Sequence, residues 1–489
     1  MLSIGREDIL ARMGEDNPWW RREPDPSEPP LSWRRRAFYD AFRNLVLGPV
    51  RRAVVLLGAR RVGKTTLLMQ FIGECVRDRR FPEVLFASLD TPTYADLSLD
   101  ELLRLFAEAR PHDPTASRLV VFDEVQYLRD WERHLKVLVD RFPHTRFVVS
   151  GSAGAALQRA STESGAGRFT DFLLPPLTFA EFLTFRDEAV VREEADRQPP
   201  MFACPDIARL NRCFVEYLNY GGYPEAILVD EVRAGFRQFV GRDIVDKVLL
   251  RDLPVLYGIS NIPGLNRLFS VLAYNTGQEV SLEDLASNAG VAKPTIKRYL
   301  EYLETAFLVY RLRRVDANAR RFRRERGFKV HLVNPSMRAA LFAPTTPEDA
   351  RFGTVVESAV LAQFLHLPDR SQVHYARWRD GEVDILRLEP ASQRPSWAVE
   401  VKWTDRAVSR RGELAALAEF AARYPGLVLG VTTKGHCRRG RLPTRHAVTF
   451  VPAALYTYAL GALSARRDNS AQRRVLEEGA LDCTFRLGE

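Results

Sequence analysis

A chain of 489 residues is longer than a single typical core, so its length favours about two to four domains. Its composition, 46% hydrophobic and 27% charged, is that of an ordinary globular protein, and no apolar run is long enough to cross a membrane. The N-terminal segment MLSIGREDILARMGEDNPWW has acidic residues and no apolar core, which argues against an export signal. Five scattered cysteines suit neither a disulfide framework nor a zinc site. We therefore expect a cytoplasmic protein without a membrane partner.

An apolar, strand-like run at 54–57 leads through a glycine-rich loop into a helical pattern. The loop reads GARRVGKT and matches G-x-x-x-x-G-K-[ST] at every fixed position. Glycines allow backbone N–H groups to surround a phosphate, Lys64 is expected to reach the β- and γ-phosphates, and Thr65 to hold Mg²⁺. The predicted ATP and Mg²⁺ site comprises Gly58, Ala59, Arg60, Arg61, Val62, Gly63, Lys64, Thr65 and Thr66.

A second apolar run, at 119–122, ends in two acidic residues. Side chains at the carboxyl end of a buried parallel strand face the crevice in which ligands bind. We expect Asp123 to support Mg²⁺ and Glu124 to act as the general base for an attacking water. Strand-like and helical patterns alternate through the rest of this region, which predicts an α/β fold with a doubly wound parallel sheet.

Several motifs of this region resemble those of AAA+ ATPases, in particular the archaeal-ATPase-like branch related to STAND signalling ATPases. The resemblance rests on GARRVGKT, VVFDEVQ, VVSGS, GAGR and YGGYPEA. It implies that Ser150 or Ser152 senses the γ-phosphate, that Arg168 is an arginine finger, and that Pro224 packs near the adenine. The alternatives for Arg168 are a surface arginine and a sensor of its own subunit, because a finger acting in trans requires a homo-oligomer.

The middle of the chain is predominantly helical. The pattern from Ile207 to Phe269 fits the helical lid that follows AAA+ cores. Beyond it, Ser281 is expected to cap a short helix with Asp284 as its capping-box partner, and a second helix begins near Lys293. The expected buried face of this second helix comprises Ile296, Leu300, Leu303 and Phe307. A strand-like tail, FLVYRLRRV, completes the pattern of a winged helix.

A basic block follows this pattern. Nine Arg or Lys residues between Arg311 and Lys329 face two acidic residues, a local balance of +7 within a net charge of +9. Winged helices also mediate protein contacts, but the density of positive charge favours DNA as the partner. The predicted DNA contacts are Lys293, Lys297, Arg298, Arg320, Arg321, Arg323 and Arg324.

The C-terminal part contains a Glu-bearing helical pattern, then GEVDI, then WAVEVKW. Carboxylates at the ends of neighbouring strands can chelate a divalent cation, and a lysine beside them can activate water. The order of these segments resembles the PD-(D/E)xK restriction-endonuclease-like fold. The resemblance implies Mg²⁺ or Mn²⁺ ligands at Glu357, Asp384 and Glu400, and a catalytic set that these three complete with Lys402.

The sequence as a whole resembles a prokaryotic family of AAA+ proteins whose C-terminal domain has no settled function. We expect an ATP-binding and hydrolysing protein that binds DNA and carries a metal-dependent nuclease domain. The alternative is an ATP-driven switch whose nuclease-like domain is a non-catalytic DNA- or protein-binding module; a small-molecule kinase is poorly supported. The expected parts are an N-terminal extension at 1–48, a P-loop core at 49–186, a helical lid and linker at 187–270, a winged helix at 271–335 and a nuclease-like domain at 336–489.

Overall fold

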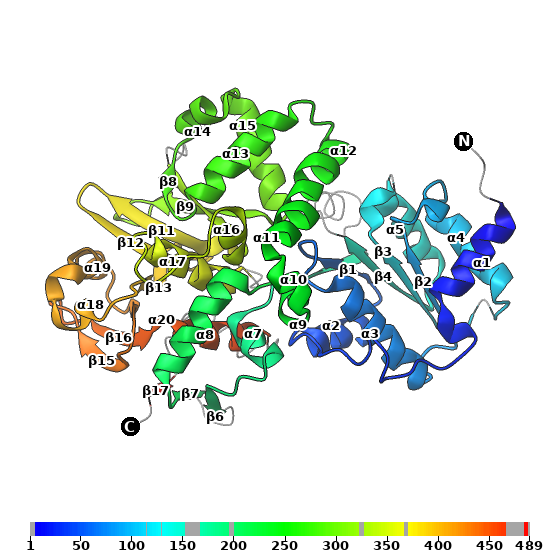
Figure 1. Cartoon of the computed structure of the whole chain (residues 1–489), viewed down its shortest axis with the longest axis horizontal. Helices are drawn as coiled ribbons and strands as arrows, with labels where there is room; N and C mark the ends of the chain where they lie inside the picture. The colour runs from blue at the N-terminus through cyan, green and yellow to red at the C-terminus, as the bar shows by residue number, and fades with distance from the viewer. Residues whose placement is uncertain are drawn as a thin grey trace. The chain divides into compact units, whose positions relative to one another are not determined.

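The computed structural model of the chain describes residues 5–113, 115–128, 130–151, 167–194, 200–321, 327–365, 370–465 and 484–487. The chain divides into two compact units, Met1–Leu174 and Pro175–Glu489, each with its own sheet (Figure 1). Within the described residues, no helix combines the length and the apolarity that crossing a membrane requires.

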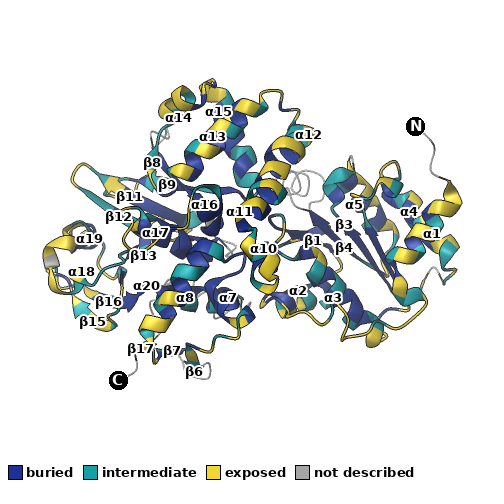
Figure 2. Cartoon of the chain, in the orientation of Figure 1, coloured by how far each residue is buried: buried dark blue, intermediate teal, exposed yellow. Residues whose placement is uncertain are grey.

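The first unit is built on a parallel five-stranded sheet of order β2-β3-β4-β1-β5. Its strands are β1 (Ala53–Leu57), β2 (Glu83–Ser88), β3 (Arg118–Asp123), β4 (Thr145–Gly151) and β5 (Phe169–Leu173). Every residue of β1 and β3 is buried, as expected for strands covered on both faces (Figure 2). The connecting helices are α3 (Lys64–Arg77), α4 (Leu99–Ala109) and α5 (Trp131–Arg141). The α/β class and the parallel sheet predicted from the sequence are confirmed.

The N-terminal segment belongs to this unit and covers its edge strand. It forms α1 (Arg6–Asp16), the short η1 (Pro18–Trp20) and α2 (Tyr39–Leu47). The Asn17 amide donates to the carbonyls of Met13 (2.8 Å) and Phe86 (2.9 Å) and accepts from the Phe86 N–H (2.6 Å). The indole N–H groups of Trp19 and Trp20 both donate to the Val84 carbonyl, at 3.1 and 2.9 Å. The NPWW motif therefore satisfies backbone groups of β2 that an uncovered edge would leave open.

The second unit is built on a mixed nine-stranded sheet of order β15-β16-β14-β13-β12-β11-β9-β10-β8. The strands are β8 (Glu279–Val280), β9 (Val309–Val315), β10 (Phe328–Leu332), β11 (Val373–Trp378), β12 (Gly381–Leu388), β13 (Pro395–Glu400), β14 (Val428–Thr433), β15 (Arg438–Arg441) and β16 (Ala447–Pro452). A separate small sheet contains β6 (Arg192–Glu194), β7 (Met201–Cys204) and β17 (Thr484–Leu487).

Helices pack on the nine-stranded sheet and form a shared core with it. Phe179 of α7 (Phe179–Phe185) lies in one buried cluster with Phe214 of α8 (Ile207–Tyr220) and Trp397 of β13. The predicted ATPase core extends to residue 186, but α7 lies in the second unit. Two further helices contribute to this cluster, α17 (Phe352–Phe364) and α20 (Ala453–Ala465). The helix α16 (Ser336–Leu341) packs in a second cluster with Phe328 of β10, and α18 (Arg406–Ser409) and α19 (Ala415–Ala421) pack in a third with Leu386 of β12.

A helical run from Pro224 to Tyr257 precedes the predicted helix-turn-helix. It contains α9 (Pro224–Leu228), α10 (Asp230–Ala234), α11 (Phe236–Gln238), the π-helical η4 (Phe239–Asp246) and η5 (Val248–Asp252), and α12 (Leu253–Tyr257). The following helices are α13 (Ile262–Tyr274), α14 (Leu282–Ala289) and α15 (Lys293–Thr305).

The helix boundaries of this region agree closely with the sequence pattern. The Ser281 hydroxyl accepts from the Asp284 N–H (3.1 Å) and caps α14, while it donates to the Asp284 carboxylate (2.6 Å). Ile296, Leu300 and Leu303 are buried on α15, as expected. Phe307 lies beyond the end of this helix with a left-handed φ of 56° and is only half-buried.

The strand β9, which follows α15, pairs with a neighbouring strand at each of its two edges. β9 pairs antiparallel with β10, as a wing would, and its other edge pairs in parallel with β11. The predicted wing is therefore part of the same sheet as the C-terminal strands, and the expected boundary at 335/336 divides a continuous sheet. The long-range pairing of β9 with β11 leaves no local pattern in the sequence.

We predict that Asn17→Ala lowers the free energy of unfolding by roughly 2–3 kcal/mol, because it leaves buried backbone groups of Phe86 and Met13 without partners. Urea denaturation of the full chain measures this. Asn44→Ala removes an exposed amide from α2 and should cost less than about 0.5 kcal/mol. An equal loss in the two variants would contradict the role of Asn17 at the sheet edge.

Candidate nucleotide site and carboxylate cluster

The glycine-rich loop lies between the end of β1 and the start of α3. A Cβ atom on Gly58 would lie 2.3 Å from the Leu174 carbonyl oxygen, so a side chain cannot fit there. Gly63 has a φ of 92°, in the left-handed region that favours glycine. Both fixed glycines of the motif therefore have a geometric cause. The helix start at Lys64 leaves N–H groups pointing toward the loop, which favours a bound phosphate.

The polar side chains predicted for nucleotide and Mg²⁺ binding come together at the ends of three strands. The Lys64 ammonium is buried and donates to the carbonyls of Gly58 (3.1 Å) and Ala59 (2.9 Å). The Thr65 hydroxyl donates to one Asp123 carboxylate oxygen (2.7 Å), and the Ser150 hydroxyl donates to the other. Since β4 lies between β1 and β3, Ser150 stands between the loop and Asp123.

Asp123 is only 1% exposed, and burial together with the neighbouring Glu124 carboxylate raises its pKa. The Thr65 hydroxyl and the Asp123 carboxylate suit a hard cation, since Mg²⁺ binds hydroxyl and carboxylate oxygens together with phosphate oxygens and water. Thr65 and Asp123 therefore fit the predicted Mg²⁺.

Glu124 leaves the strand with an unusual backbone conformation. Its φ of 55° is left-handed for a residue with a side chain, and such conformations gather at functional sites. Its N–H donates to the Ser150 hydroxyl oxygen (3.4 Å), and its carboxylate accepts from the Gln126 amide. Gln126 is a site residue that sequence reasoning did not identify. Arg36 is another: it is buried and donates to the carbonyl of Val62 within the loop (2.6 Å).

Arg168 lies at the amino-terminal end of the parallel strands, opposite the end that carries the glycine-rich loop. It immediately precedes β5, and its carbonyl accepts from the N–H of Ala53 at the start of β1. The loop follows the far end of β1, roughly 15 Å away along a strand of this length. Within this unit, Arg168 therefore lies away from its own glycine-rich loop. Its role as a finger in trans stays a prediction.

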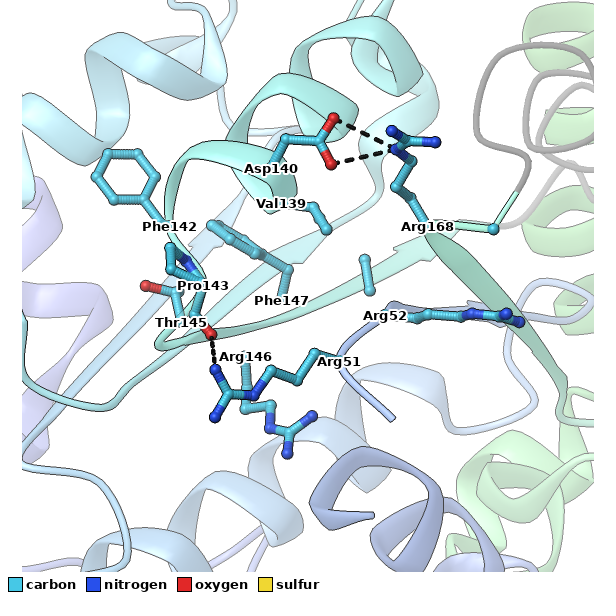
Figure 3. A pocket seen from close by; sticks show the side chains of 12 residues that line it. Arg51, Arg52, Val139, Asp140, Phe142, Pro143, Thr145, Arg146, Phe147 and Arg168 are labelled. Atoms are coloured by element: carbon cyan, nitrogen blue, oxygen red, sulfur yellow. Dashed lines mark hydrogen bonds and ion pairs between the residues drawn. The ribbon is translucent and has the colours of Figure 1, made fainter. Parts of the chain in front are cut away.

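Arg168 lines a pocket of about 340 Å³ at this end of the strands, together with Arg51, Arg52 and Arg146 (Figure 3). Its guanidinium forms an ion pair with Asp140 (3.1 Å).

Two other predicted positions add nothing to the nucleotide site as described. Ser152 lies outside the described residues, and Pro224 begins α9 of the second unit, so its contact with adenine stays a prediction.

The second unit gathers the four residues predicted for a nuclease site. Glu357 comes from α17, Asp384 from β12 and Glu400 from the end of β13, with Lys402 just beyond it. The Lys402 ammonium pairs with Glu400 (2.7 Å), and the Asp384 carboxylate accepts from the Val401 N–H (2.8 Å). Burial and neighbouring carboxylates raise the pKa of Glu357 and of Glu400 above the usual range.

An unpredicted lysine lies among these carboxylates. The Lys329 ammonium, from β10, lies 2.9 Å from Glu357, 2.6 Å from Glu382 and 3.9 Å from Asp384. We call Glu357, Glu382, Asp384 and Glu400 the carboxylate cluster. The available sequence signal was a lysine two residues before a histidine in a short strand pattern, FKVHL.

The carboxylate cluster does not fit the predicted Mg²⁺ or Mn²⁺. Among the residues that the structure describes, no three Asp, Glu, His or Cys side chains are gathered so that they could hold a metal ion. In addition, the Lys329 ammonium lies among these carboxylates and forms ion pairs with Glu357 and Asp384. The prediction that Glu357, Asp384 and Glu400 are metal ligands is not supported by this geometry.

The predicted DNA contacts divide into exposed and engaged residues. Lys297 and Arg298 are exposed on α15, whereas Lys293 pairs with Glu283 (2.5 Å). Arg320 is exposed, and the exposed Arg321 donates to the Gln372 side chain (3.2 Å). Arg323 and Arg324 lie outside the described residues.

The basic block is also less exposed than its composition suggests. Arg311 is buried and pairs with Glu304 (2.9 Å), and Lys329 is buried in the carboxylate cluster. Every residue of β10 is buried, and so is Arg311 on β9, so the +7 counted from the sequence overstates the surface charge.

We predict that Lys64→Ala weakens ATP binding by about tenfold to a hundredfold, because charge-assisted contacts contribute roughly 1.5–3 kcal/mol. Glu124→Gln should keep ATP affinity and lower the hydrolysis rate by about a hundredfold or more, as expected for a lost general base. Titration with ATP and steady-state phosphate release measure the two effects. Glu132→Gln on α5 is the matched control and should change neither. Unchanged binding in Lys64→Ala would show that the site is wrongly assigned.

Comparisons with known proteins locate two recognisable regions. Residues 50–183 match the model of an AAA domain, and residues 211–348 match a domain of unknown function, DUF8612. An uncharacterised protein of Mycobacterium tuberculosis is 29% identical over 435 residues, 86% of this chain and 83% of that protein. An uncharacterised protein of Methanocaldococcus jannaschii is 26% identical over 263 residues, 53% of this chain, and the match spans only 56% of the relative's length.

Solved structures resemble the chain only distantly. The Aeropyrum pernix ORC1 protein in complex with DNA has a TM-score of 0.30 and 13% identity, and covers 69% of this chain and 93% of its own. AMPPCP-bound DnaA from Aquifex aeolicus has a TM-score of 0.27 and 14% identity, over 62% of this chain and 92% of its own. Scores this low carry no functional conclusion. The AAA domain match and the geometry of the loop agree: the first unit contains an AAA domain with a P-loop.

Proposed function

We propose that the chain is an ATP-driven switch that acts on DNA: the first unit hydrolyses ATP, and the second unit binds DNA. The observation that carries the first half is the hydrogen-bonded set of Thr65, Asp123 and Ser150 beside the buried Lys64. These groups have the chemistry that phosphoryl transfer requires, which is mainly positioning and stabilisation of charge.

Each residue of this set has a distinct part in hydrolysis. Lys64 stabilises negative charge on the β- and γ-phosphates, and Glu124 accepts a proton from the attacking water. Thr65 and Asp123 would hold Mg²⁺, which neutralises phosphate charge when it is bound. Ser150 donates to Asp123 and receives the Glu124 N–H, so a changed phosphate contact at Ser150 is transmitted to both carboxylate-bearing residues. Ser150 is therefore the residue that we propose to report the state of the nucleotide.

The DNA half of the proposal rests on α15. This helix buries Ile296, Leu300 and Leu303 and leaves Lys297 and Arg298 exposed on another face. A helix with an apolar face packed in a three-helix arrangement and a basic outer face suits a position against the DNA backbone or in a groove. The hairpin of β9 and β10 follows directly, as in a winged helix.

For the C-terminal strands we propose the non-catalytic role, in which the nuclease-like part is a DNA- or protein-binding module. The observation that favours it is Lys329, whose ammonium engages Glu357, Glu382 and Asp384. The metal-dependent nuclease is the second candidate. It is supported by the convergence of Glu357, Asp384, Glu400 and Lys402 in one place.

Reversal of the exposed charges on α15 tests the DNA contact. Lys297→Glu/Arg298→Glu should weaken binding to a labelled duplex by at least about tenfold and lower the salt slope by about 2, if each cation contacts one phosphate. Fluorescence anisotropy over a series of salt concentrations measures both. The matched control, Arg237→Glu/Arg242→Glu, makes the same charge change at exposed positions of the same unit and should have a much smaller effect. Equal losses in the two variants would mean that only net charge matters.

A plasmid cleavage assay separates the two C-terminal roles. With Mg²⁺ or Mn²⁺, and with or without ATP, we expect the native chain to produce no more nicked or linear DNA than Lys402→Ala. Cleavage by the native chain that Lys402→Ala abolishes would overturn the non-catalytic role and establish the nuclease.

A further inference from the structure

The carboxylate cluster contains a cation that the chain itself supplies. Lys329 is only 4% exposed, and its ammonium approaches the carboxylates of Glu357, Glu382 and Asp384 from two elements, α17 and β12. The ring of Tyr375 lies 5.4 Å from the same ammonium and adds a cation–π contact. Burial alone would disfavour a charged ammonium, and the three adjacent carboxylates offset that cost.

The backbone holds Lys329 in this position. It is the second residue of β10 and is paired with Leu312 of β9 on one side and with Glu279 of β8 on the other. A side chain based on a strand paired at both edges cannot leave the cluster by a backbone movement without breaking the sheet. Its departure would also leave buried carboxylates without a counter-charge, which is strongly unfavourable.

A divalent cation would have to compete with this lysine. The ammonium already engages Glu357 and Asp384, two of the three carboxylates predicted as metal ligands, and it is attached to the chain, so it pays no cost of association from solvent. A metal ion added within a few ångströms of the ammonium would also be repelled by it.

Two further polar atoms beside the carboxylate cluster have no hydrogen-bond partner within the part of the chain that the structure describes. Glu400 Oε2 is buried and accepts no hydrogen bond, although Glu400 Oε1 pairs with Lys402. The Ser358 hydroxyl donates to the Thr354 carbonyl and is bonded to His331 Nδ1, so Nδ1 carries the proton. His331 Nε2 is therefore a bare acceptor, and it lies 3.8 Å from Glu357 Oε1.

We propose that Lys329 is the built-in cation of the carboxylate cluster and takes the place of a divalent metal. The native cluster is then a metal-free ion-pair site, and replacement of Lys329 by a neutral side chain converts it into a site for Mn²⁺ or Mg²⁺ held by carboxylate oxygens. This inference deepens the proposed non-catalytic role of the C-terminal strands and rests on it.

Binding of Mn²⁺, followed by electron paramagnetic resonance, tests the proposal. All chains carry Asp123→Asn, which removes the expected metal ligand of the nucleotide site, and the samples contain neither ATP nor DNA. The parent should show no bound Mn²⁺ that Glu357→Gln removes. Lys329→Met should gain one bound Mn²⁺, at least about tenfold tighter than any site of the parent, and should lose it on addition of Glu357→Gln. Mn²⁺ should also raise the melting temperature of Lys329→Met and leave that of the parent unchanged.

Two further variants keep the test decisive. Lys402→Met removes a lysine that contacts Glu400 alone among the ion pairs described, and it should gain no such site because Lys329 remains. Lys329→Met/Glu382→Gln removes the lysine together with one carboxylate, which lessens the repulsion if Lys329→Met alone does not fold. The circular dichroism spectrum checks folding.

Two results would overturn the proposal. One is Mn²⁺ bound to the parent at a site that Glu357→Gln abolishes. The other is a folded Lys329→Met, or its Glu382→Gln double variant, that gains no Mn²⁺, or gains no more than Lys402→Met does. Since the assay contains no ATP or DNA, either result leaves the ATP-driven switch to be judged by its own measurements, and failure of the switch would leave the Mn²⁺ result unchanged.

Discussion

The nucleotide site depends on one buried carboxylate, Asp123, at the end of β3. A carboxylate that is 1% exposed requires hydrogen-bond donors, and its two oxygens receive them from Thr65 and Ser150. Thr65 belongs to the helix that follows the loop, and Ser150 belongs to the strand between β1 and β3. The requirement to satisfy one carboxylate therefore fixes three elements relative to one another. A change of charge at the loop, such as the arrival or loss of a phosphate, acts on all three at once.

The second unit meets the same electrostatic requirement differently. Arg311 pairs with Glu304 and Lys329 with the carboxylate cluster, so charges that the sequence suggests for DNA or for metal are neutralised inside the protein. Among the described residues of these segments, exposed cations remain on α15 and at Arg313, Arg320 and Arg321. The physical difference between the units is that the first keeps its carboxylate with neutral hydroxyl partners, which a cation can join. In the second unit, the Lys329 ammonium is already a cation among the carboxylates.

Much of the first unit could be predicted from the sequence because its signals are local. The motif places its fixed glycines, Lys64 and Thr65 close together in the sequence. The register of the parallel strands then brings Asp123 and Ser150 to the same end of the sheet. Ser281 and the start of α15 were likewise predictable from capping and from the apolar face of the helix. Arg36 was not, because its contact with Val62 joins positions that no local pattern relates.

In the second unit, prediction failed where the structure depends on long-range pairing. The sequence pattern of β9 and β10 suits a wing, but it does not reveal that β9 also pairs with β11. That pairing places β10 beside the C-terminal strands and thereby brings Lys329 to Glu357 and Asp384. The four predicted residues do converge, and the lysine that alters their chemistry comes from the segment interpreted as DNA-binding.

We propose that the nucleotide site controls the DNA-bound state. The affinity for a labelled duplex, measured with and without ATP at one salt concentration, tests this control. Glu124→Gln, which should bind ATP without turning it over, is compared with Lys64→Ala. We predict that ATP changes the DNA affinity of Glu124→Gln by about fivefold or more, as expected for allosteric coupling, and leaves that of Lys64→Ala unchanged. A DNA affinity of Glu124→Gln that is the same with and without saturating ATP would contradict the account.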